Sequence, residues 1–174
     1  RTSTHAVTTL SPGHAFMVST VAFDSAGERF VSASWDQSVR LWDSHTRRQI
    51  RCFGDPIELL DLLEDDGDGN ILMFHCAEFS MTGDKVIAGA QDGALHCWDL
   101  SDGREDRLER AHDSPILALA MHPHGQQFAS AGRDGLVVMW SMPEIRRLYR
   151  FNLSQAVHRI RFSPDVRLLA ATWD

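Results

Sequence analysis

Apolar residues recur along this chain in short runs with a period of two, and turn-forming residues follow each run. Near residues 38–43, for example, Val39 and Leu41 alternate with Arg40. Side chains of a β-strand point alternately to opposite faces of its sheet, so this pattern predicts strands rather than helices. Because the runs are also rich in β-branched and aromatic residues, an all-β fold is expected.

The pattern of strands and turns repeats along the chain. Segments 21–43, 76–99, 119–141 and 160–174 align with one another, the last running into the C-terminus. Their turn aspartates and tryptophans keep the same spacings of 56 and 42 residues, at Asp36, Asp92 and Asp134, and at Trp42, Trp98 and Trp140. A fourth strand is expected after each tryptophan, around 47–53, 105–110 and 145–151. Four strands in a unit of about 42 residues are typical of a propeller blade.

The repeat predicts one domain of four units, at 13–54, 71–110, 111–151 and an incomplete 152–174, with a further strand near His5 to Leu10. The wider first spacing places an acidic insertion at 55–70, with the sequence DPIELLDLLEDDGDGN. Its residues 59–63 fit an LxxLL pattern and nearly fit a clathrin-binding box. Asp66, Asp68 and Asn70 imitate the opening of an EF-hand loop, but Ile71 replaces the required glycine. A solvated loop with a small packed turn is the favoured interpretation.

The chain resembles the WD40 repeat family from Gly13-His14 to Trp173-Asp174, and the pair Gly13-His14 with Trp42-Asp43 matches that family's signature. The resemblance implies a partial β-propeller, because family members usually close a ring of about seven blades. The chain begins with Arg1 rather than Met, and an open arc of blades would expose apolar faces. We therefore expect it to be part of a longer polypeptide.

The resemblance also implies a buried hydrogen-bonded network of His, Ser, Asp and Trp that locks a blade. Such a network can satisfy a buried carboxylate, which is otherwise costly, so these residues are interpreted as structural although they resemble a Ser-His-Asp triad. The second unit has Asn70 and Ala88 at the His and Ser positions, and the fourth has Leu153 at the His position. Two sets with identical internal spacing fit the network: His14, Ser32, Asp36 and Trp42, and His112, Ser130, Asp134 and Trp140.

In the resembled family, the residue before the turn aspartate projects onto the face where loops surround the central channel. Trp and Arg are the types most enriched at interface hot spots, which makes these positions candidates for protein binding. The alternative is that each Trp packs against the neighbouring blade. The candidate residues are Trp35, Gln91, Arg133 and Trp173.

Composition narrows the possible partners. There are 17 Lys and Arg against 24 Asp and Glu, a net charge of −7, which disfavours direct nucleic-acid contact by this segment. No apolar run approaches the roughly 20 residues that span a bilayer, so membrane insertion is not expected. Cys52, Cys76 and Cys97 form no CxxC pair and suggest free thiols in the cytoplasm or nucleus. His122 and His124 lack a third ligand nearby, so neither a metal nor a cofactor is expected.

These features favour a non-catalytic protein-interaction scaffold within a multi-subunit assembly. One alternative is a subunit of a nucleoprotein complex in RNA processing or chromatin, and another is an accessory propeller domain of a larger enzyme. The chain contains no nucleophile elbow, P-loop or paired catalytic acids. The WDxR box of cullin-4 ubiquitin ligase receptors is also incomplete, because Ser44-His45 and Leu100-Ser101 follow the two Trp-Asp pairs.

Overall fold

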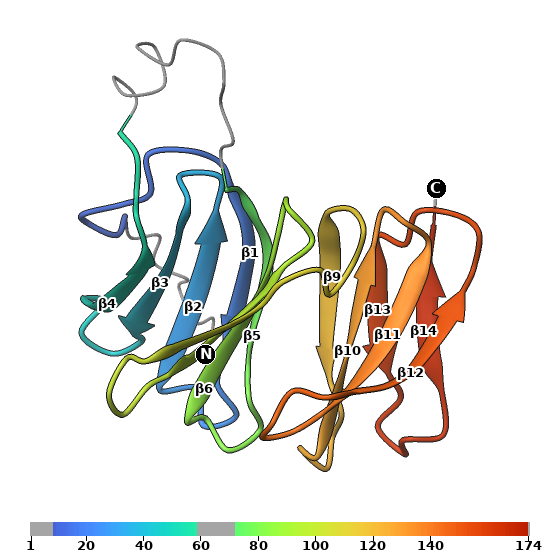
Figure 1. Cartoon of the computed structure of the whole chain (residues 1–174). Coiled ribbons are helices and arrows are strands. Elements are labelled where there is room, and N and C mark those ends of the chain that lie inside the picture. The colour runs from blue at the N-terminus through green and yellow to red at the C-terminus, as the bar shows by residue number, and fades with distance from the viewer. Residues whose placement is uncertain (1–8, 59–71, 174) are drawn as a thin grey trace, which may run out of the picture.

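A computed structural model describes residues 9–58 and 72–173, which form a row of antiparallel sheets in chain order (Figure 1). Three sheets have four strands each, joined by short hairpins. The first contains β1 (Val18–Phe23), β2 (Arg29–Ser34), β3 (Ser38–Asp43) and β4 (Gln49–Gly54). The second contains β5 (Phe74–Phe79), β6 (Lys85–Ala90), β7 (Leu95–Asp99) and β8 (Glu105–Leu108). The third contains β9 (Ile116–Met121), β10 (Gln127–Gly132), β11 (Leu136–Ser141) and β12 (Arg147–Asn152).

A fourth sheet pairs β13 (Arg159–Phe162) with β14 (Leu169–Thr172). The first strands of the sheets, β1, β5, β9 and β13, contact one another in succession, while later strands of each sheet lie progressively further out. This arrangement is that of adjacent propeller blades, so the predicted fold class, an all-β partial propeller, is confirmed. The fourth strands β4, β8 and β12 lie where the sequence predicted them.

Two expectations fall partly or wholly beyond the described residues. Of the strand expected at residues 5–10, only 9 and 10 are described, and they are not in a strand. Within the 55–70 insertion, residues 55–58 are described without regular structure, and the LxxLL and EF-hand-like residues lie outside the described ranges.

Burial in the middle strands departs from the alternation expected of a half-exposed sheet. β3, β7 and β11 are buried along almost their whole lengths. Arg40, the polar member of the alternation, is only 8% exposed. Successive side chains of these strands still point to opposite faces of the sheet. Neighbouring blades and loops cover both faces of the middle strands, so the side chains on each face are buried.

The contact between the first two sheets shows how blades pack. Phe53 of β4 is 4% exposed and stacks on Trp98 of the second sheet, with ring centroids 5.0 Å apart. Within the second sheet, Phe74 meets the same indole edge-on, with ring centroids 5.8 Å apart. Burying a side chain of this size contributes about 1.5–3 kcal/mol to stability, so the blades are held together mainly by such apolar contacts.

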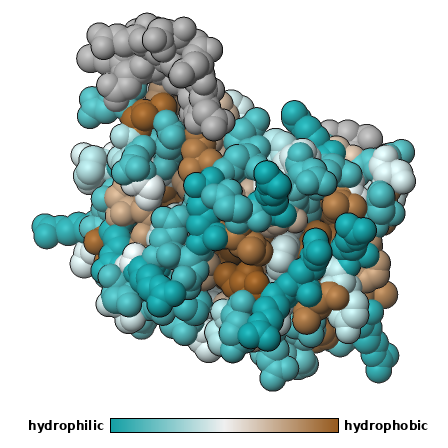
Figure 2. Space-filling view, viewed as in Figure 1, coloured by the Kyte–Doolittle hydropathy of each residue, from teal (hydrophilic) through white to brown (hydrophobic). Residues whose placement is uncertain are grey.

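The outer faces of the row are apolar and uncovered. Phe23 in β1 is 60% exposed, whereas the equivalent Phe79 in β5 is 4% exposed. At the other end, Phe151 in β12 is 52% exposed, whereas the equivalent Phe53 in β4 is buried. Figure 2 shows that apolar side chains interrupt the polar surface on the side viewed. Phe23 and Phe151 therefore stand at positions whose equivalents, Phe79 and Phe53, are buried in the cluster between the first two sheets.

Candidate interaction face and its supporting network

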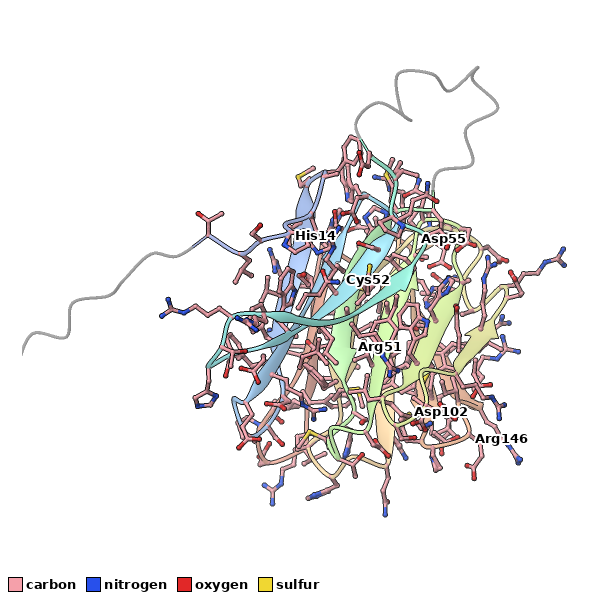
Figure 3. All side chains as sticks on the ribbon, turned by 90° about the vertical axis from the view of Figure 1, so that its left-hand side faces the viewer. His14, Arg51, Cys52, Asp55, Asp102 and Arg146 are labelled. Atoms are coloured by element: carbon pink, nitrogen blue, oxygen red, sulfur yellow. The ribbon has the colours of Figure 1, made fainter. Side chains whose placement is uncertain are left out.

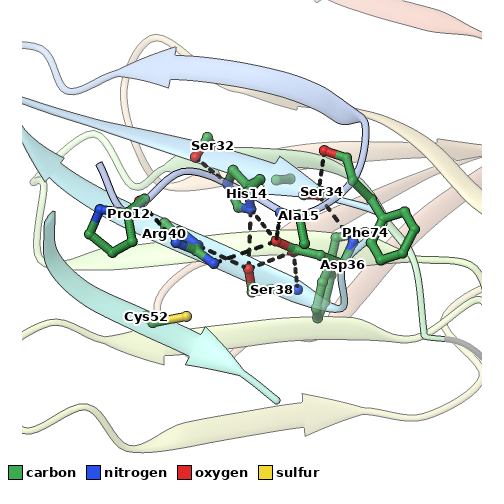
Figure 4. Close-up of polar contacts among 12 residues, drawn as sticks. Pro12, His14, Ala15, Ser32, Ser34, Asp36, Ser38, Arg40, Cys52 and Phe74 are labelled. Atoms are coloured by element: carbon green, nitrogen blue, oxygen red, sulfur yellow. Dashed lines mark hydrogen bonds and ion pairs between the residues drawn. The ribbon is translucent and has the colours of Figure 1, made fainter. Parts of the chain in front are cut away.

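A chain of hydrogen bonds connects the first turn aspartate, Asp36, with the first repeat tryptophan, Trp42. Figure 4 shows its part from Asp36 through His14 to Ser32. The His14 ring donates through Nδ1 to Asp36 Oδ2 at 2.8 Å, and its Nε2 accepts from the Ser32 hydroxyl at 2.6 Å. The Trp42 indole N–H donates to the same hydroxyl oxygen at 2.9 Å. The four side chains expected to form a network are therefore brought together from the segment before β1, from β2 and β3, and from the turn between them.

Asp36 is fully buried and receives more donors than the motif alone implies. The backbone N–H of Ala15 donates to Oδ2, and the Ser38 hydroxyl and N–H both donate to Oδ1. The Arg40 guanidinium lies 3.6 Å from the carboxylate. Burial alone would raise the pKa of Asp36, but the hydrogen bonds from His14, Ser38 and Ala15 outweigh it and hold this pKa well below 3.8. The carboxylate is thus charged and satisfied.

The third sheet repeats the arrangement. His112 Nδ1 contacts both oxygens of Asp134, at 3.1 and 3.0 Å, and its Nε2 lies 2.7 Å from the Ser130 hydroxyl. Trp140 donates its indole N–H to Ser130 at 2.8 Å. The backbone N–H groups of Asp113 and Leu136 complete the carboxylate's partners. The same spacing in the sequence therefore gives the same order of hydrogen bonds in both sheets, from the aspartate through the histidine and the serine to the tryptophan.

The second sheet satisfies its turn aspartate differently. With Ala88 in place of the serine, Asp92 pairs with the Arg107 guanidinium from β8, and Arg107 also contacts Glu109. His96 is 3% exposed and lies against Trp98, and its Nδ1 donates to Glu105 at 2.5 Å. Burial lowers the pKa of His96 below 6.5, an effect that Glu105 only partly offsets. The ring is therefore neutral near pH 7.

The Ser-His-Asp geometry in the first and third sheets does not form an accessible nucleophile. Ser32 is 4% exposed and Ser130 is fully buried. Each hydroxyl donates to a histidine, and its oxygen accepts an indole N–H. A nucleophile must present a free oxygen lone pair to a substrate, and these oxygens face the protein interior. The arrangement can rigidify a turn, which positions the residue just before each aspartate.

Those preceding residues occupy equivalent backbone positions. The N–H groups of Trp35, Gln91 and Arg133 donate to the carbonyl groups of Met17, Met73 and Pro115, each 18 residues earlier in the chain. This bond ties the turn between the second and third strands to the start of the first strand in the same sheet. All these turns lie at one end of the sheets, the upper end in Figure 1.

The side chains at these positions differ in their surroundings. Trp35 is half-buried edge-on against His75, with ring centroids 6.1 Å apart, and its indole N–H is buried with no hydrogen-bond partner. His75 Nε2 lies 2.6 Å from the Gln91 amide oxygen. Arg133 is exposed, and Trp173 is 54% exposed. Trp35 thus packs partly against the second sheet, whereas the other side chains are available to solvent.

Sequence reasoning missed several polar residues behind this face. Ser38 and Arg40 complete the first network, and His96 and Arg107 replace it in the second sheet. A usable signal was present, because Arg40 and His96 are polar residues at equivalent positions in strands that are otherwise buried and apolar. Val138 fills that position in the third sheet.

The cysteines and the histidine pair show no metal-binding arrangement. Cys76 and Cys97 are buried free thiols, and burial raises their pKa values to about 12 and about 11. His122 and His124 lie in the β9–β10 turn with ring centroids 5.4 Å apart. Among residues 9–58 and 72–173, no three or more His, Cys, Asp or Glu side chains gather as metal ligands would. The same residues contain no helix long and apolar enough to cross a membrane.

Comparison with known proteins agrees with this geometry. The WD40 family, described as the WD domain or G-beta repeat, matches residues 4–43 and 106–141. The first matched segment contains all four residues of the first network, and the second contains all four residues of the second network. Residues 4–43 and 106–141 therefore carry WD40 repeats. The second sheet, of which the family match includes only the end of β8, has the same strand order as the first sheet but a different set of polar contacts.

Several WD40-repeat proteins resemble the chain over much of its length. It is 26% identical to the small ribosomal subunit protein RACK1y of Oryza sativa subsp. japonica, over 93% of this chain and 59% of that protein. It is 28% identical to a p21-activated protein kinase-interacting protein 1-like of Gallus gallus, over 87% and 37% of the two chains. A serine-threonine kinase receptor-associated protein of Dictyostelium discoideum is 25% identical, over 67% and 34%. The chain therefore spans between 34% and 59% of the length of these relatives.

Proposed function

We propose that this chain is a protein-interaction scaffold, part of a WD40 subunit in a multi-protein assembly. Its partner-binding face carries Trp35, Gln91, Arg133 and Trp173. The observation that best supports this function is the exposure of Trp173 and Arg133 at equivalent ends of their sheets. Gln91 is exposed at the equivalent turn of the second sheet. Large aromatic and guanidinium side chains contribute most to protein interfaces because they combine desolvated area with a polar group.

The unpaired donors on this face suggest the chemistry of the partner. The Trp35 indole N–H has no acceptor, and the exposed Arg133 guanidinium presents further N–H groups. A partner surface that offers carbonyl or carboxylate oxygens would accept hydrogen bonds from Arg133, whereas the buried Trp35 N–H would need its side chain to move before it could reach such an acceptor. The rigid networks behind the turns hold these groups in place before binding, which reduces the entropy lost on association.

The uncovered apolar faces indicate how the scaffold is completed. Phe23 and Phe151 occupy positions whose equivalents, Phe79 and Phe53, pack against a neighbouring blade. We propose that further WD40 blades cover both faces, which agrees with the greater length of the relatives. Covering each phenylalanine would contribute about 1.5–3 kcal/mol.

The names of two relatives support a role in protein binding. One is described as a p21-activated protein kinase-interacting protein and another as a serine-threonine kinase receptor-associated protein. Both names describe proteins that associate with other proteins. From these two names we infer only that the partner is a protein, and not which protein it is.

The test is quantitative affinity purification of the full-length protein and of a Trp35→Ala, Arg133→Ala, Trp173→Ala triple variant from native extract. Selective loss of one or a few partners from the variant is expected, because three contributors to one interface have been removed. A matched Arg104→Ala variant changes a guanidinium that is 72% exposed on a different hairpin, and it should retain every partner.

Thermal unfolding of all variants establishes that they remain folded. If the triple variant keeps every partner at wild-type abundance, the proposed face is wrong, and binding involves another surface.

A further inference from the structure

The two parts of the chain differ in charge. Residues 1–132 contain 20 Asp and Glu against 10 Lys and Arg, whereas residues 133–174 contain 4 Asp and Glu against 7 Arg. Three of these seven arginines are exposed in β12 or just before it, and we call them the basic strip: Arg146, Arg147 and Arg150. Figure 3 shows Arg146 at the margin of the molecule, in the hairpin that leads into β12. An otherwise acidic chain therefore presents a row of positive charge along the outer strand of its third sheet.

The second sheet has arginines at two equivalent positions and pairs both of them. The carbonyl groups of Arg104 and Arg146 accept the same hairpin-closing hydrogen bond in their sheets. Arg107 and Arg150 stand opposite equivalent residues of the third strand. Arg104 and Arg107 each form an ion pair with an aspartate of the second sheet. The fold thus supplies acceptors for arginines at these positions in one sheet.

The third sheet lacks both acceptors. Tyr149 stands at the position of Asp106, the partner of Arg104. The turn aspartate Asp134 already accepts from the His112 ring and from two backbone N–H groups. Among the residues that the structure describes, no carboxylate forms an ion pair with an arginine of the basic strip. The strip therefore presents guanidinium groups of a kind that the second sheet neutralises internally.

β12 also has an open edge. It is the outermost strand of its sheet, it pairs with β11 alone among the described strands, and all six of its residues are exposed. Tyr149 is 63% exposed. The side chain of Asp106, at the same position, is 58% exposed although it borders a cavity shared with residues 143–145 of the third sheet. A neighbouring blade therefore leaves this position accessible, and the edge of β12 offers unpaired backbone N–H and C=O groups.

The side chains of β12 are divided between the two faces of the sheet. Arg147 and Arg150 stand opposite residues of β11 that pack toward the second sheet. Tyr149 stands opposite Met139, which packs toward the fourth sheet. A strand added beside β12 would place its own side chains next to those of β12 on the same face. It would therefore meet guanidinium groups on one face and an aromatic ring on the other.

We propose that β12 binds an extended segment of a partner protein as a fifth strand of the third sheet, and that this segment alternates acidic and apolar residues. Main-chain hydrogen bonds along the open edge hold the segment, its carboxylates pair with the basic strip, and an apolar side chain packs on Tyr149. A nucleic acid would supply negative charge, but it has no peptide groups to continue the ladder of hydrogen bonds, and the acidic remainder of the chain would repel its phosphates. This surface lies on the outer rim, apart from the partner-binding face proposed above, and does not depend on it.

The test uses the full-length protein and three fluorescein-labelled synthetic peptides of equal length. The first alternates Glu and Val, the second has Lys in place of each Glu, and the third has the same Glu and Val residues in two blocks. Fluorescence anisotropy measures their affinity for wild type and for an Arg147→Glu, Arg150→Glu double variant. An Arg104→Glu, Arg167→Glu double variant is the matched control, because it changes the net charge equally at two exposed arginines.

We expect wild type to bind the alternating acidic peptide at least about tenfold more tightly than either other peptide. The Arg147→Glu, Arg150→Glu variant should lose at least about tenfold in affinity, whereas the control should retain it. Tyr149→Asp, which copies the second sheet by placing a carboxylate near Arg146, should also weaken binding. Circular dichroism and thermal midpoints verify that each variant is folded.

Modified peptides test the added strand without any change to the protein. Successive N–H groups of a strand point to opposite sides, so alternate ones face the neighbouring strand. Methylating the peptide nitrogens one at a time should therefore weaken binding at alternate positions.

The proposal is overturned if the three peptides bind equally, if both double variants weaken binding to the same extent, or if methylation has no alternating effect. It is also overturned if a labelled single-stranded oligonucleotide binds more tightly than the alternating peptide and loses affinity in the Arg147→Glu, Arg150→Glu variant, which would make a nucleic acid the ligand. The Trp35→Ala, Arg133→Ala, Trp173→Ala variant separates the two proposals. It should bind the alternating peptide with wild-type affinity whether or not it loses its cellular partners.

Discussion

The first and second sheets solve the same structural problem with different chemistry. Each has an aspartate in the turn between its second and third strands and a tryptophan at the end of its third strand. In the first sheet, Asp36 is fully buried and is satisfied by a histidine, a serine and backbone N–H groups. In the second, the Asp92 side chain is 26% exposed and is satisfied by Arg107, which is 40% exposed.

The difference shows that strand order does not require the buried network. Apolar packing across the junction, such as that of Phe53 on Trp98, places the second sheet beside the first without such a network in the second sheet. The network instead makes a particular turn rigid, because a satisfied buried polar cluster permits few alternative arrangements. In the second sheet, where Ala88 stands at the serine position, His96 and Arg107 supply polar contacts from other positions.

Replacing the buried aspartate should have the largest effect on stability. Asp36→Ala leaves the His14 ring, the Ser38 hydroxyl and the Ala15 N–H without their acceptor. We expect a loss of about 3–5 kcal/mol in the free energy of unfolding, measured by chemical denaturation. Asp92→Ala should cost at most about 1 kcal/mol, because its ion pair is partly solvated. Equal losses in the two variants would remove the distinction between the sheets.

Removing the hydroxyl that joins histidine to tryptophan should have the next largest effect. Ser130→Ala leaves the buried Trp140 indole N–H and the His112 ring nitrogen unpaired, at a cost of about 1–3 kcal/mol. The control is Ser25→Ala at an exposed turn, which should change stability by less than about 0.5 kcal/mol. A loss no greater than that of the control would mean that the network does not stabilise the third sheet.

The two sheets should lose stability in different ranges of pH. The pKa of His96 lies below its ordinary 6.5, so its contribution is complete above pH 6.5 and is lost as the pH falls toward the lowered value. The pKa of Asp36 lies below its ordinary 3.8, so its contribution is lost only below about pH 3.8. Unfolding measured from pH 7.5 to 5 should become less pH-dependent in His96→Val. An unchanged slope would contradict a neutral buried His96.

The smallest effect is expected at the exposed arginine. Arg107→Ala should cost at most about 1 kcal/mol, and its effect should shrink in high salt. Arg40→Ala should cost more and should respond less to salt, because Arg40 is 8% exposed and donates to Pro12 and Gln49 as well as lying beside Asp36. Parallel denaturation at low and high salt tests the pair, and the reverse order of salt sensitivity would show that burial does not distinguish them.

The sequence by itself determined the strand pattern, the repeat and which residues could form the two networks. Period-two runs and turn residues are local signals, and the shared spacing of His14 and His112 relative to their Asp and Trp partners is visible in one dimension. The turn position of Trp35, Gln91 and Arg133 followed from the same register, and the structure gives all three the same backbone hydrogen bond.

Only the tertiary structure decided what each side chain meets across the junctions. It buried Arg40, which alternates with apolar residues along its strand, packed Trp35 partly against His75, and left one buried nitrogen of His96 and one of Arg51 without a hydrogen-bond partner. Two of these outcomes involve residues 40 or more positions apart, Trp35 with His75 and Arg51 with Gly103, whose contacts arise from the stacking of blades. The local sequence pattern does not show such contacts, because the burial of a side chain depends on which neighbouring sheet covers its face of the strand.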